Sequence, residues 1–228
     1  MLAVTACLFA SLAAAQSTSS LLDMPVDAKT LRVFSQAEEV YERTDYDRAF
    51  FIFRNELAPI GDKYGQYMVG FMYLTGKGVE EDRIKASSWY RLAAERGTKE
   101  YVRVAEQVVA TLDSTQLADS DRLFIELRKK FGDLVLVRNA IRKDMELLRR
   151  RTGSRLSKTT SPTTIVDVSR PGETRSGADY YGEIERRIEA RLEYIASRVD
   201  IDIVDFDTAK LDLETIDEHL AAHLSQID

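Results

Sequence analysis

Apolar and small residues recur at helical spacing over residues 61–97, with glycines where the chain must turn. Gly65, Val69 and Tyr73 stand four residues apart on one face, which predicts a first helix. A second helix is predicted after Asp82, where alanines alternate with bulky aromatic side chains as they do at close helix contacts. The residues expected to pack or turn are Gly70, Tyr73, Gly76, Gly78, Ala86, Trp89, Tyr90, Ala93, Ala94 and Gly97. The pattern predicts a helical hairpin whose apolar face must be covered by neighbouring units.

The turn between these two helices is marked by Gly76 and Gly78, which bracket Lys77. Glycine adopts positive φ angles without a steric cost, so the pair predicts a tight reversal of the chain. The Gly-x-x-x-x-Gly-Lys-Ser/Thr frame of a phosphate-binding loop is missing from this segment. We therefore interpret the glycines as turn residues and not as part of a nucleotide site.

The same residues resemble the Sel1-like repeats, a branch of the tetratricopeptide-like helical repeats. The matching positions are Gln66, Tyr67, Gly70, Met72, Tyr73, Gly76, Gly78, Val79, Asp82, Ala86, Trp89, Tyr90, Ala93, Ala94, Glu95 and Gly97. The chain departs from the family at Gly65, where alanine is usual. The resemblance implies hairpins that stack into a short superhelix, with first helices that line a concave groove for protein or peptide partners.

Weaker copies of the pattern flank the central hairpin on both sides. Apolar spacing over residues 33–57 predicts a complete hairpin upstream, and residues 101–112 predict the first helix of a degenerate third hairpin. Together they predict a repeat region over residues 28–112, with its best copy at residues 61–97. The fold class expected is mostly all-α, a short α–α superhelix of hairpins.

After the repeats the chain becomes basic and then changes to a linker composition. Residues 121–158 contain twelve lysines and arginines against five acidic residues. Two amphipathic helices separated by Gly132 are predicted within residues 113–151, where they would cap the array. Serine, threonine, glycine and proline then predict a linker over residues 152–178, with a short strand at residues 164–168.

The last segment, residues 179–228, is predicted to be an acidic helical unit. Apolar residues at three- and four-residue spacing form a stripe along a long helix; they are Tyr181, Ile184, Ile188, Leu192, Ile195 and Val199. A short strand at residues 199–203 and a final helix at residues 211–224 are expected to follow. The segment carries fourteen acidic and five basic side chains, opposite in sign to the basic helices. It is expected to dock either on the same chain or on another subunit.

The first fifteen residues predict a secretory signal peptide. Residues 2–15 are apolar or small, end in three alanines, and give way to a polar run that begins at Gln16. Such a signal predicts export to a bacterial-type periplasm. Cys7, the single cysteine, follows Val-Thr-Ala as in a lipoprotein processing box, so a lipid-anchored envelope protein is the alternative. Cleavage after Ala15 would remove Cys7 and leave a chain without disulfides.

No motif in the sequence indicates catalysis, a metal or a cofactor. His219 and His223 stand four residues apart on the predicted last helix, but a third ligand and the His-Glu-x-x-His order are missing. Alternating aspartates over residues 200–207 lack the glycine and final glutamate of a calcium-binding loop. The net charge of −6 gives no overall attraction for nucleic acid. We therefore expect no cofactor, no metal site and no nucleic-acid partner.

The candidate binding residues are Tyr64, Met68 and Phe71, which form a second apolar face on the first helix of the best repeat. They predict a groove for a protein or peptide, because methionine and aromatic side chains give adaptable contact area. The alternative is that the C-terminal helix covers them as core. The function predicted from this surface is a noncatalytic adaptor or scaffold of the bacterial cell envelope.

Two other functions are alternatives to the adaptor. The basic segment 122–158 could bind anionic lipid or polysaccharide, which would be one route to membrane association, lipidation at Cys7 being the other. A cell-wall-related envelope enzyme would need an active site that the sequence does not display.

Overall fold

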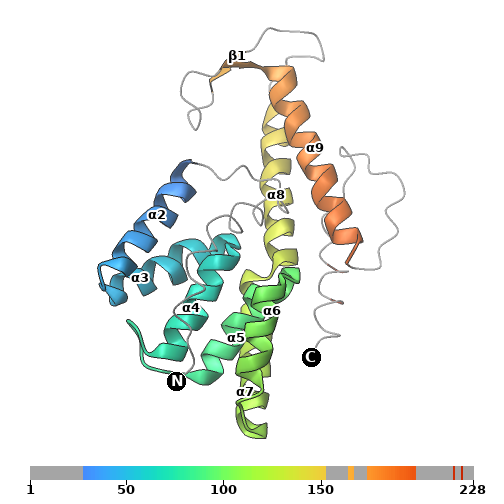
Figure 1. The fold of residues 1–228 in the computed structure, drawn as a ribbon. Coiled ribbons are helices and arrows are strands. Elements are labelled where there is room, and N and C mark those ends of the chain that lie inside the picture. The colour runs from blue at the N-terminus through green and yellow to red at the C-terminus, as the bar shows by residue number, and fades with distance from the viewer. Residues whose placement is uncertain (1–27, 153–163, 167–173, 199–217, 219–221, 223–228) are drawn as a thin grey trace. The chain divides into compact units, whose positions relative to one another are not determined.

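The computed structural model describes residues 28–152, 164–166, 174–198, 218 and 222 of the 228-residue chain (Figure 1). Contacts divide the chain into two compact units, Met1–Val135 and Leu136–Asp228, called here unit 1 and unit 2. Helices dominate the described residues, which also contain a two-stranded sheet. The mostly all-α class predicted from the sequence is confirmed.

Some predicted features lie outside the described residues. They are the signal peptide at residues 1–15 with Cys7, the strand at residues 199–203, His219 and His223. Of the final helix predicted at residues 211–224, the structure describes Glu218 and Ala222, and both are helical.

Unit 1 begins with two helical hairpins. The first pairs α2 (Ala28–Glu42) with α3 (Tyr46–Ile52), whose path continues through a π-helical turn at Phe53–Leu57 and a 3-10 turn at Ala58–Ile60. The second pairs α4 (Lys63–Thr75) with α5 (Arg83–Ala93), which ends in a 3-10 turn at Ala94–Arg96. Within each hairpin the two helices pack against each other, so both hairpins predicted from apolar spacing are present (Figure 1).

Two further helices of unit 1 pack against α5. They are α6 (Lys99–Val109) and α7 (Ser114–Phe131), and the hydroxyl of Ser88 on α5 donates to the carbonyl oxygen of Ser120 on α7 at 3.0 Å. Gly132 ends α7, as predicted. The sequence assigned α7 to the basic capping helices predicted within residues 113–151. In the structure α7 belongs to unit 1 and packs against α5, with Ser120 and Leu127 buried.

Aspartates and glycines set the ends of α4 and α5. The carboxylates of Asp62 and Asp82 accept hydrogen bonds from the backbone N–H of Gly65 and Lys85, at 2.6 Å and 2.9 Å. Gly76 ends α4 in the left-handed conformation, with φ of 66°. The Asp82 cap and the turn glycine fall where the sequence pattern predicted them, whereas the Asp62 cap was not predicted.

The departure from the repeat pattern at Gly65 has a steric cause. A Cβ atom at Gly65 would lie 2.7 Å from the Cβ of Leu57, in the π-helical turn of the first hairpin. At Gly70 a Cβ would lie 3.1 Å from Cγ of Tyr90 and 3.2 Å from the carbonyl oxygen of Ala86. Both glycines therefore let α4 approach its neighbours more closely than alanine would.

Unit 2 contains most of α8 (Asp133–Thr152) and all of α9 (Gly177–Ala196), with a short antiparallel sheet between them in sequence. The sheet pairs β1 (Thr164–Val166) with β2 (Thr174–Ser176). The predicted strand at residues 164–168 is present as β1. Its partner β2 was not predicted, because its three residues Thr-Arg-Ser lack a hydrophobic alternation.

An apolar seam and a buried ion pair join α8 to α9, which lie side by side (Figure 1). The predicted stripe on α9 is confirmed for Ile184, Ile188, Leu192 and Ile195, which are buried, whereas Tyr181 is half-buried and Val199 lies outside the described residues. The buried apolar residues of α8 in unit 2 are Val137, Ile141 and Met145. Buried Asp144 of α8 accepts hydrogen bonds from Arg187, at 3.0 Å, and from Arg191 of α9. At this contact the acidic group belongs to the basic segment and the basic groups belong to the acidic segment, which is the opposite of what the net charges of the two segments suggest.

We predict that Gly65→Ala destabilises unit 1 although alanine favours helices. The new methyl group collides with Leu57, and overpacking costs about 1–3 kcal/mol, more than the gain of up to about 1 kcal/mol in helix propensity. Urea unfolding of the full chain measures the change. Gly182→Ala in α9 is the matched control, because no atom lies within 4 Å of the new Cβ, and it should stabilise the chain. Equal effects of the two substitutions would contradict the steric explanation.

Candidate binding surface

Helix α4 is the most enclosed helix of unit 1, and the three predicted groove residues lie inside the core. The exposed fractions of Tyr64, Met68 and Phe71 are 8%, 1% and 8%. Helix α2 covers them: the rings of Phe34 and Tyr64 are 5.4 Å apart, and those of Tyr41 and Phe71 are 6.5 Å apart. The prediction of an open groove at these residues is therefore wrong for the structure, because the preceding hairpin fills it.

A polar link fixes α2 on this face of α4. The hydroxyl of Tyr64 donates a hydrogen bond to Oε1 of Glu38 at 2.8 Å. Burial raises the pKa of the Tyr64 phenol, and the neighbouring Glu38 carboxylate raises it further. The phenol thus stays protonated, as its donor role requires, and holds the two hairpins together.

Apart from its exposed last residue, Thr75, the accessible part of α4 is a narrow stripe formed by Tyr67 and Leu74, seven residues apart. The ring of Tyr67 stacks on that of Tyr101 from α6, with centroids 5.1 Å apart and planes 27° apart. Tyr67 also meets buried Tyr90 edge-on at 5.1 Å. We call Tyr67, Leu74, Tyr101 and Val104 the tyrosine face; all four are partly exposed, the first two on α4 and the last two on α6.

Tyr101 of the tyrosine face keeps its phenolic proton at ordinary pH, because burial and the nearby Asp62 carboxylate raise its pKa to about 12. Burial also raises the pKa of Tyr90, whose ring meets that of Tyr67. The face therefore offers flat apolar rings with a neutral hydroxyl group at Tyr101, a combination that suits contacts with a protein surface.

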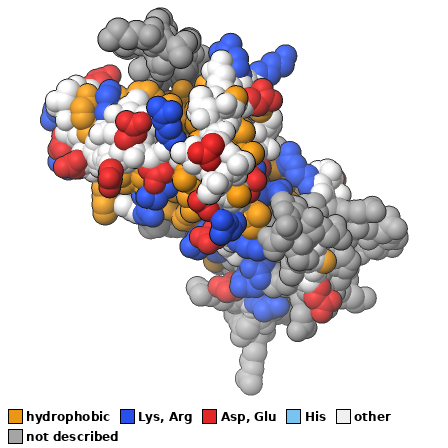
Figure 2. Space-filling model, turned by 90° about the horizontal axis from the view of Figure 1, so that it is seen from below, with side chains coloured by type: hydrophobic (Ala, Val, Ile, Leu, Met, Phe, Trp, Pro, Cys, Tyr) orange, Lys and Arg blue, Asp and Glu red, His pale blue; other side chains and the backbone are white. Residues whose placement is uncertain are grey.

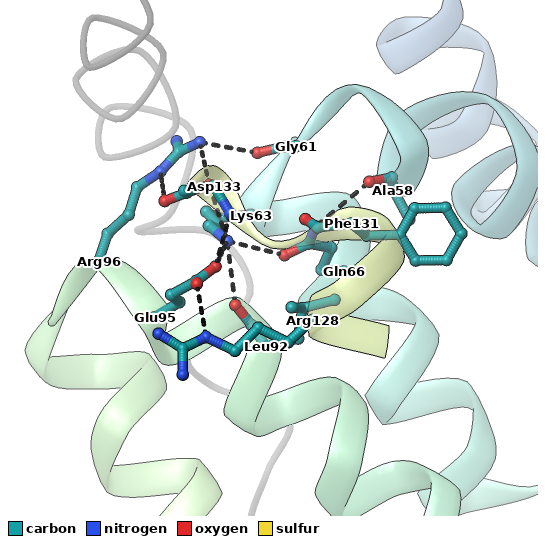
Figure 3. A network of polar contacts seen from close by, with 10 residues as sticks. All are labelled: Ala58, Gly61, Lys63, Gln66, Leu92, Glu95, Arg96, Arg128, Phe131 and Asp133. Carbon is teal, nitrogen blue, oxygen red and sulfur yellow. Dashed lines mark hydrogen bonds and ion pairs between the residues drawn. The ribbon is translucent and has the colours of Figure 1, made fainter. Parts of the chain in front are cut away.

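Lys63, the first residue of α4, is buried at the centre of a polar network (Figure 3). The ammonium group of Lys63, 1% exposed, contacts carboxylate oxygens of Glu95 at 3.2 Å and Asp133 at 3.1 Å. It also donates to the carbonyl oxygen of Leu92 at 3.0 Å and to Oε1 of Gln66 at 3.1 Å. Four acceptors surround three donor hydrogens, so the group is fully engaged and has a structural role.

Two arginines complete the network (Figure 3). Arg96 holds the carboxylate of Asp133 through Nε at 2.8 Å and a terminal nitrogen at 3.0 Å, and it also donates to the carbonyl oxygen of Gly61 at 3.1 Å. Arg128 pairs with Glu95 at 3.2 Å. Burial alone would raise the pKa of Asp133, but the hydrogen bond from Arg96 and the charge of Lys63 outweigh it and lower that pKa.

The network is independent of the residues that the sequence pattern singled out for packing. Those residues nevertheless occupy the core of the hairpin, as expected: Gly70, Tyr73, Ala86, Trp89, Tyr90 and Ala93 are all buried. The ring of Trp89 stacks on that of Phe131 at the end of α7, with centroids 5.8 Å apart. Ala94 and Gly97 lie in the turn that follows α5, where Gly97 has φ of 76°.

Comparison with known families gives one match, which coincides with the hairpin just described. Residues 63–98, from the start of α4 to just beyond Gly97, match the family model of the Sel1 repeat. The chain contains a Sel1 repeat. No curated protein and no solved structure gives a significant match to the chain. This match confirms the resemblance to the Sel1-like repeats that the residues indicated. Sel1 repeats are in general protein-interaction modules and are generally non-enzymatic.

The basic residues near the Sel1 repeat are largely engaged in ion pairs. Arg128 pairs with Glu95, Arg122 lies 2.6 Å from Asp119, and Arg91 lies 2.7 Å from Asp121. On the face shown in Figure 2, acidic and basic side chains are intermixed over the described residues. Within the basic segment, Arg122 and Arg128 are thus paired with carboxylates of their own chain.

In the part of the chain that the structure describes, no three histidine, cysteine or acidic residues are placed to share a metal ion. None of the helices in that part has the length and apolar character needed to cross a membrane.

Sequence reasoning missed Lys63, because a lysine at the start of a helix is ordinarily solvated and its spacing gives no sign of burial. Its carboxylate partners lie 32 and 70 residues further along the chain, beyond the reach of helical periodicity. Sequence reasoning also treated Tyr67 only as a match to the repeat family, and Tyr101 and Val104 only as part of the helix predicted at residues 101–112. The signal that was available for them is the aromatic residue near the start of each of these two helices, Tyr67 and Tyr101.

We predict that Phe71→Ala lowers the melting temperature of the chain by several degrees. Phe71 is buried under α2, and removing a buried phenylalanine side chain costs about 3–5 kcal/mol. Thermal unfolding followed by circular dichroism measures the shift. Phe51→Ala is the control, because Phe51 is 58% exposed and its removal should change stability by no more than about 0.5 kcal/mol. An unchanged melting temperature for Phe71→Ala would contradict the burial of Phe71 and favour the open groove predicted from the sequence.

We also predict a pH-dependent loss of stability in Asp133→Asn. At pH 7 the substitution should cost about 3 kcal/mol, because Lys63 and Arg96 lose a buried carboxylate. The folded pKa of Asp133 is lowered, so its contribution is complete above the unfolded value of about 4 and is lost as pH falls through the folded value. The difference from wild type should therefore shrink below about pH 4 in urea unfolding.

Asp119→Asn is the control for this measurement, because its pair with Arg122 is exposed and worth no more than about 1 kcal/mol. A difference between Asp133→Asn and wild type that is the same at pH 3 and pH 7 would show that the carboxylate charge is not what stabilises the fold.

Proposed function

We propose that the protein is a noncatalytic adaptor that binds a protein or peptide partner on its tyrosine face. The observation that carries the proposal is the stack of Tyr67 on Tyr101, which brings partly exposed side chains of α4 and α6 together. Sel1 repeats in general mediate protein interactions, and this face takes the place of the groove that α2 fills. The partner itself is defined here only as a protein or peptide.

The chemistry of the tyrosine face suits such a partner. Tyrosine is enriched at the centres of protein interfaces, since its ring buries a large area with little loss of side-chain entropy and its hydroxyl satisfies a polar group. Tyr67 is already positioned by contacts with Tyr90 and Tyr101, so little ordering is required on binding. Leu74 and Val104 add apolar area at the edges of the face.

The compartment proposed for this adaptor is the bacterial periplasm, with a lipid-anchored envelope protein as the alternative. The support comes from the sequence, in the apolar run that ends at Ala15 and in Cys7. Binding to anionic lipid or polysaccharide through residues 122–158 has less support, since arginines of that segment pair with their own chain. An enzyme of the cell envelope would need reactive side chains at an active site. The buried ammonium group of Lys63 is engaged by four acceptors and so does not supply such a group.

Site-specific photo-crosslinking tests the adaptor. A benzoylphenylalanine in place of Tyr101, in the full chain expressed in bacterial cells, should give a discrete crosslinked protein, and Tyr67→Ala should reduce its yield about tenfold. The reduction corresponds to the loss of about 1.4 kcal/mol that a central aromatic contributes to an interface. Benzoylphenylalanine in place of Phe51, an exposed residue of the second helix α3, is the matched control.

Two results decide the experiment. Crosslinks of equal yield at the two positions, or a yield at position 101 that Tyr67→Ala leaves unchanged, would refute the tyrosine face as the binding surface. Mass spectrometry of the same purified protein reads its N-terminus: a chain that begins at Gln16 supports export, and an acylated Cys7 supports the lipid-anchored form.

A further inference from the structure

Three aromatic rings surround the ammonium group of Lys77, in the turn between α4 and α5. Its Nζ lies 4.9 Å from the ring centroid of Tyr46, 5.1 Å from that of Tyr41 and 5.4 Å from that of Phe71. It also donates a hydrogen bond to the hydroxyl of Tyr41 at 2.9 Å. The rings come from the end of α2, the start of α3 and the middle of α4; we call Tyr41, Tyr46 and Phe71 the aromatic cage.

The rings of the aromatic cage enclose the cation from several sides. The planes of Tyr41 and Tyr46 are inclined by 58°, and those of Tyr41 and Phe71 by 63°, so the rings do not stack flat on one another. Cages of this type recognise quaternary ammonium groups, because the negative faces of the rings attract a cation that holds its water weakly. Elsewhere in the described chain Lys85 lies over the single ring of Tyr73, at 5.5 Å, which gives a comparison without a cage.

The cage is held in place by contacts that do not involve the ammonium group. Phe71 is buried in the core, and α2 is tied to α4 by the Glu38–Tyr64 hydrogen bond. The backbone at Gly78 lies against the α2–α3 turn so closely that a Cβ there would lie 2.2 Å from the carbonyl oxygen of Tyr46. The turn backbone is thus fixed, whereas the partly exposed Lys77 side chain can rotate away.

We propose that the aromatic cage binds a quaternary ammonium group and that Lys77 occupies the cage when this ligand is absent. A trimethylammonium group spreads its charge over methyl groups that touch all three rings, while the primary ammonium of Lys77 is compact and strongly hydrated. The ligand therefore exchanges with Lys77 in one site. The cage is separate from the tyrosine face, so the proposal stands independently of the adaptor function.

Titration of the full chain with choline tests the cage. Binding is followed by the proton resonance of the choline N-methyl groups, which ring currents shift upfield inside a cage. If Lys77 fills the cage about nine-tenths of the time, Lys77→Ala should lower the apparent Kd about tenfold relative to wild type. The neutral isostere 3,3-dimethylbutan-1-ol should show no saturable shift, because it lacks the charge that the rings attract. Adding Tyr46→Ala to Lys77→Ala should abolish choline binding.

The controls separate a cage from general loosening of the fold. Lys77→Met keeps the aliphatic stem on the rings and is used in place of Lys77→Ala if that variant melts below wild type. Lys85→Ala, at the single-ring site, should leave choline binding unchanged. N-trimethyllysine amide, titrated in parallel, distinguishes a modified side chain from a choline-type group as the preferred ligand by which of the two binds more tightly.

The proposal fails if neither Lys77 variant, folded as wild type, gives a saturable choline shift. It also fails if the neutral isostere binds as tightly as choline, or if Lys85→Ala produces the same gain in affinity as Lys77→Ala.

Discussion

The buried ammonium group of Lys63 is the constraint on which the arrangement of unit 1 depends. Removing such a charge from water costs several kcal/mol, and only close carboxylates with good geometry offset that cost. Glu95 follows α5 and Asp133 begins α8, so the lysine stabilises the fold only when these segments meet the start of α4. Asp133 gains further from its place in the first turn of α8, where a negative charge is favoured.

This dependence ties the Sel1 repeat to segments outside the residues that match the family. The family match ends at residue 98, but the network that surrounds Lys63 draws on Arg128 and Asp133, which lie beyond it. The first hairpin is needed for a different reason, since α2 covers the apolar residues of α4. The repeat is thus stabilised by apolar contacts on one side and by ionic contacts on the other.

Helical periodicity, capping residues and turn glycines predicted the parts of the fold that depend on contacts between residues close in sequence. Asp82 as a cap and Gly76 and Gly78 as turn residues follow from backbone geometry, and Gly70 follows from the close contact of α4 with Tyr90. The stripe on α9 could likewise be read from its spacing. Each of these features concerns residues within about one hairpin of each other.

The features that could not be predicted depend on contacts between distant segments. A single repeat shows that its first helix has two apolar faces, but not which of them the preceding hairpin covers. Phe71 therefore looked like a binding residue until the position of α2 was known. The buried pairs of Lys63 with Asp133 and of Asp144 with Arg191 are equally invisible to periodicity, because a charged residue fits the solvent-facing pattern whether or not it is exposed.

The burial of α4 also limits how this repeat can recognise anything. Ten of its thirteen residues are buried, so a partner can reach the helix only along the stripe of Tyr67 and Leu74 or at its ends. A stripe of two residues is too narrow for a stable interface, and under the proposed function the additional area comes from α6. The stacking of Tyr67 on Tyr101 joins α4 to α6, while the C-terminal end of α4 leads into the turn that carries Lys77 and its aromatic cage. Under both proposals, recognition therefore depends on contacts between segments outside a single hairpin more than on the Sel1 hairpin alone.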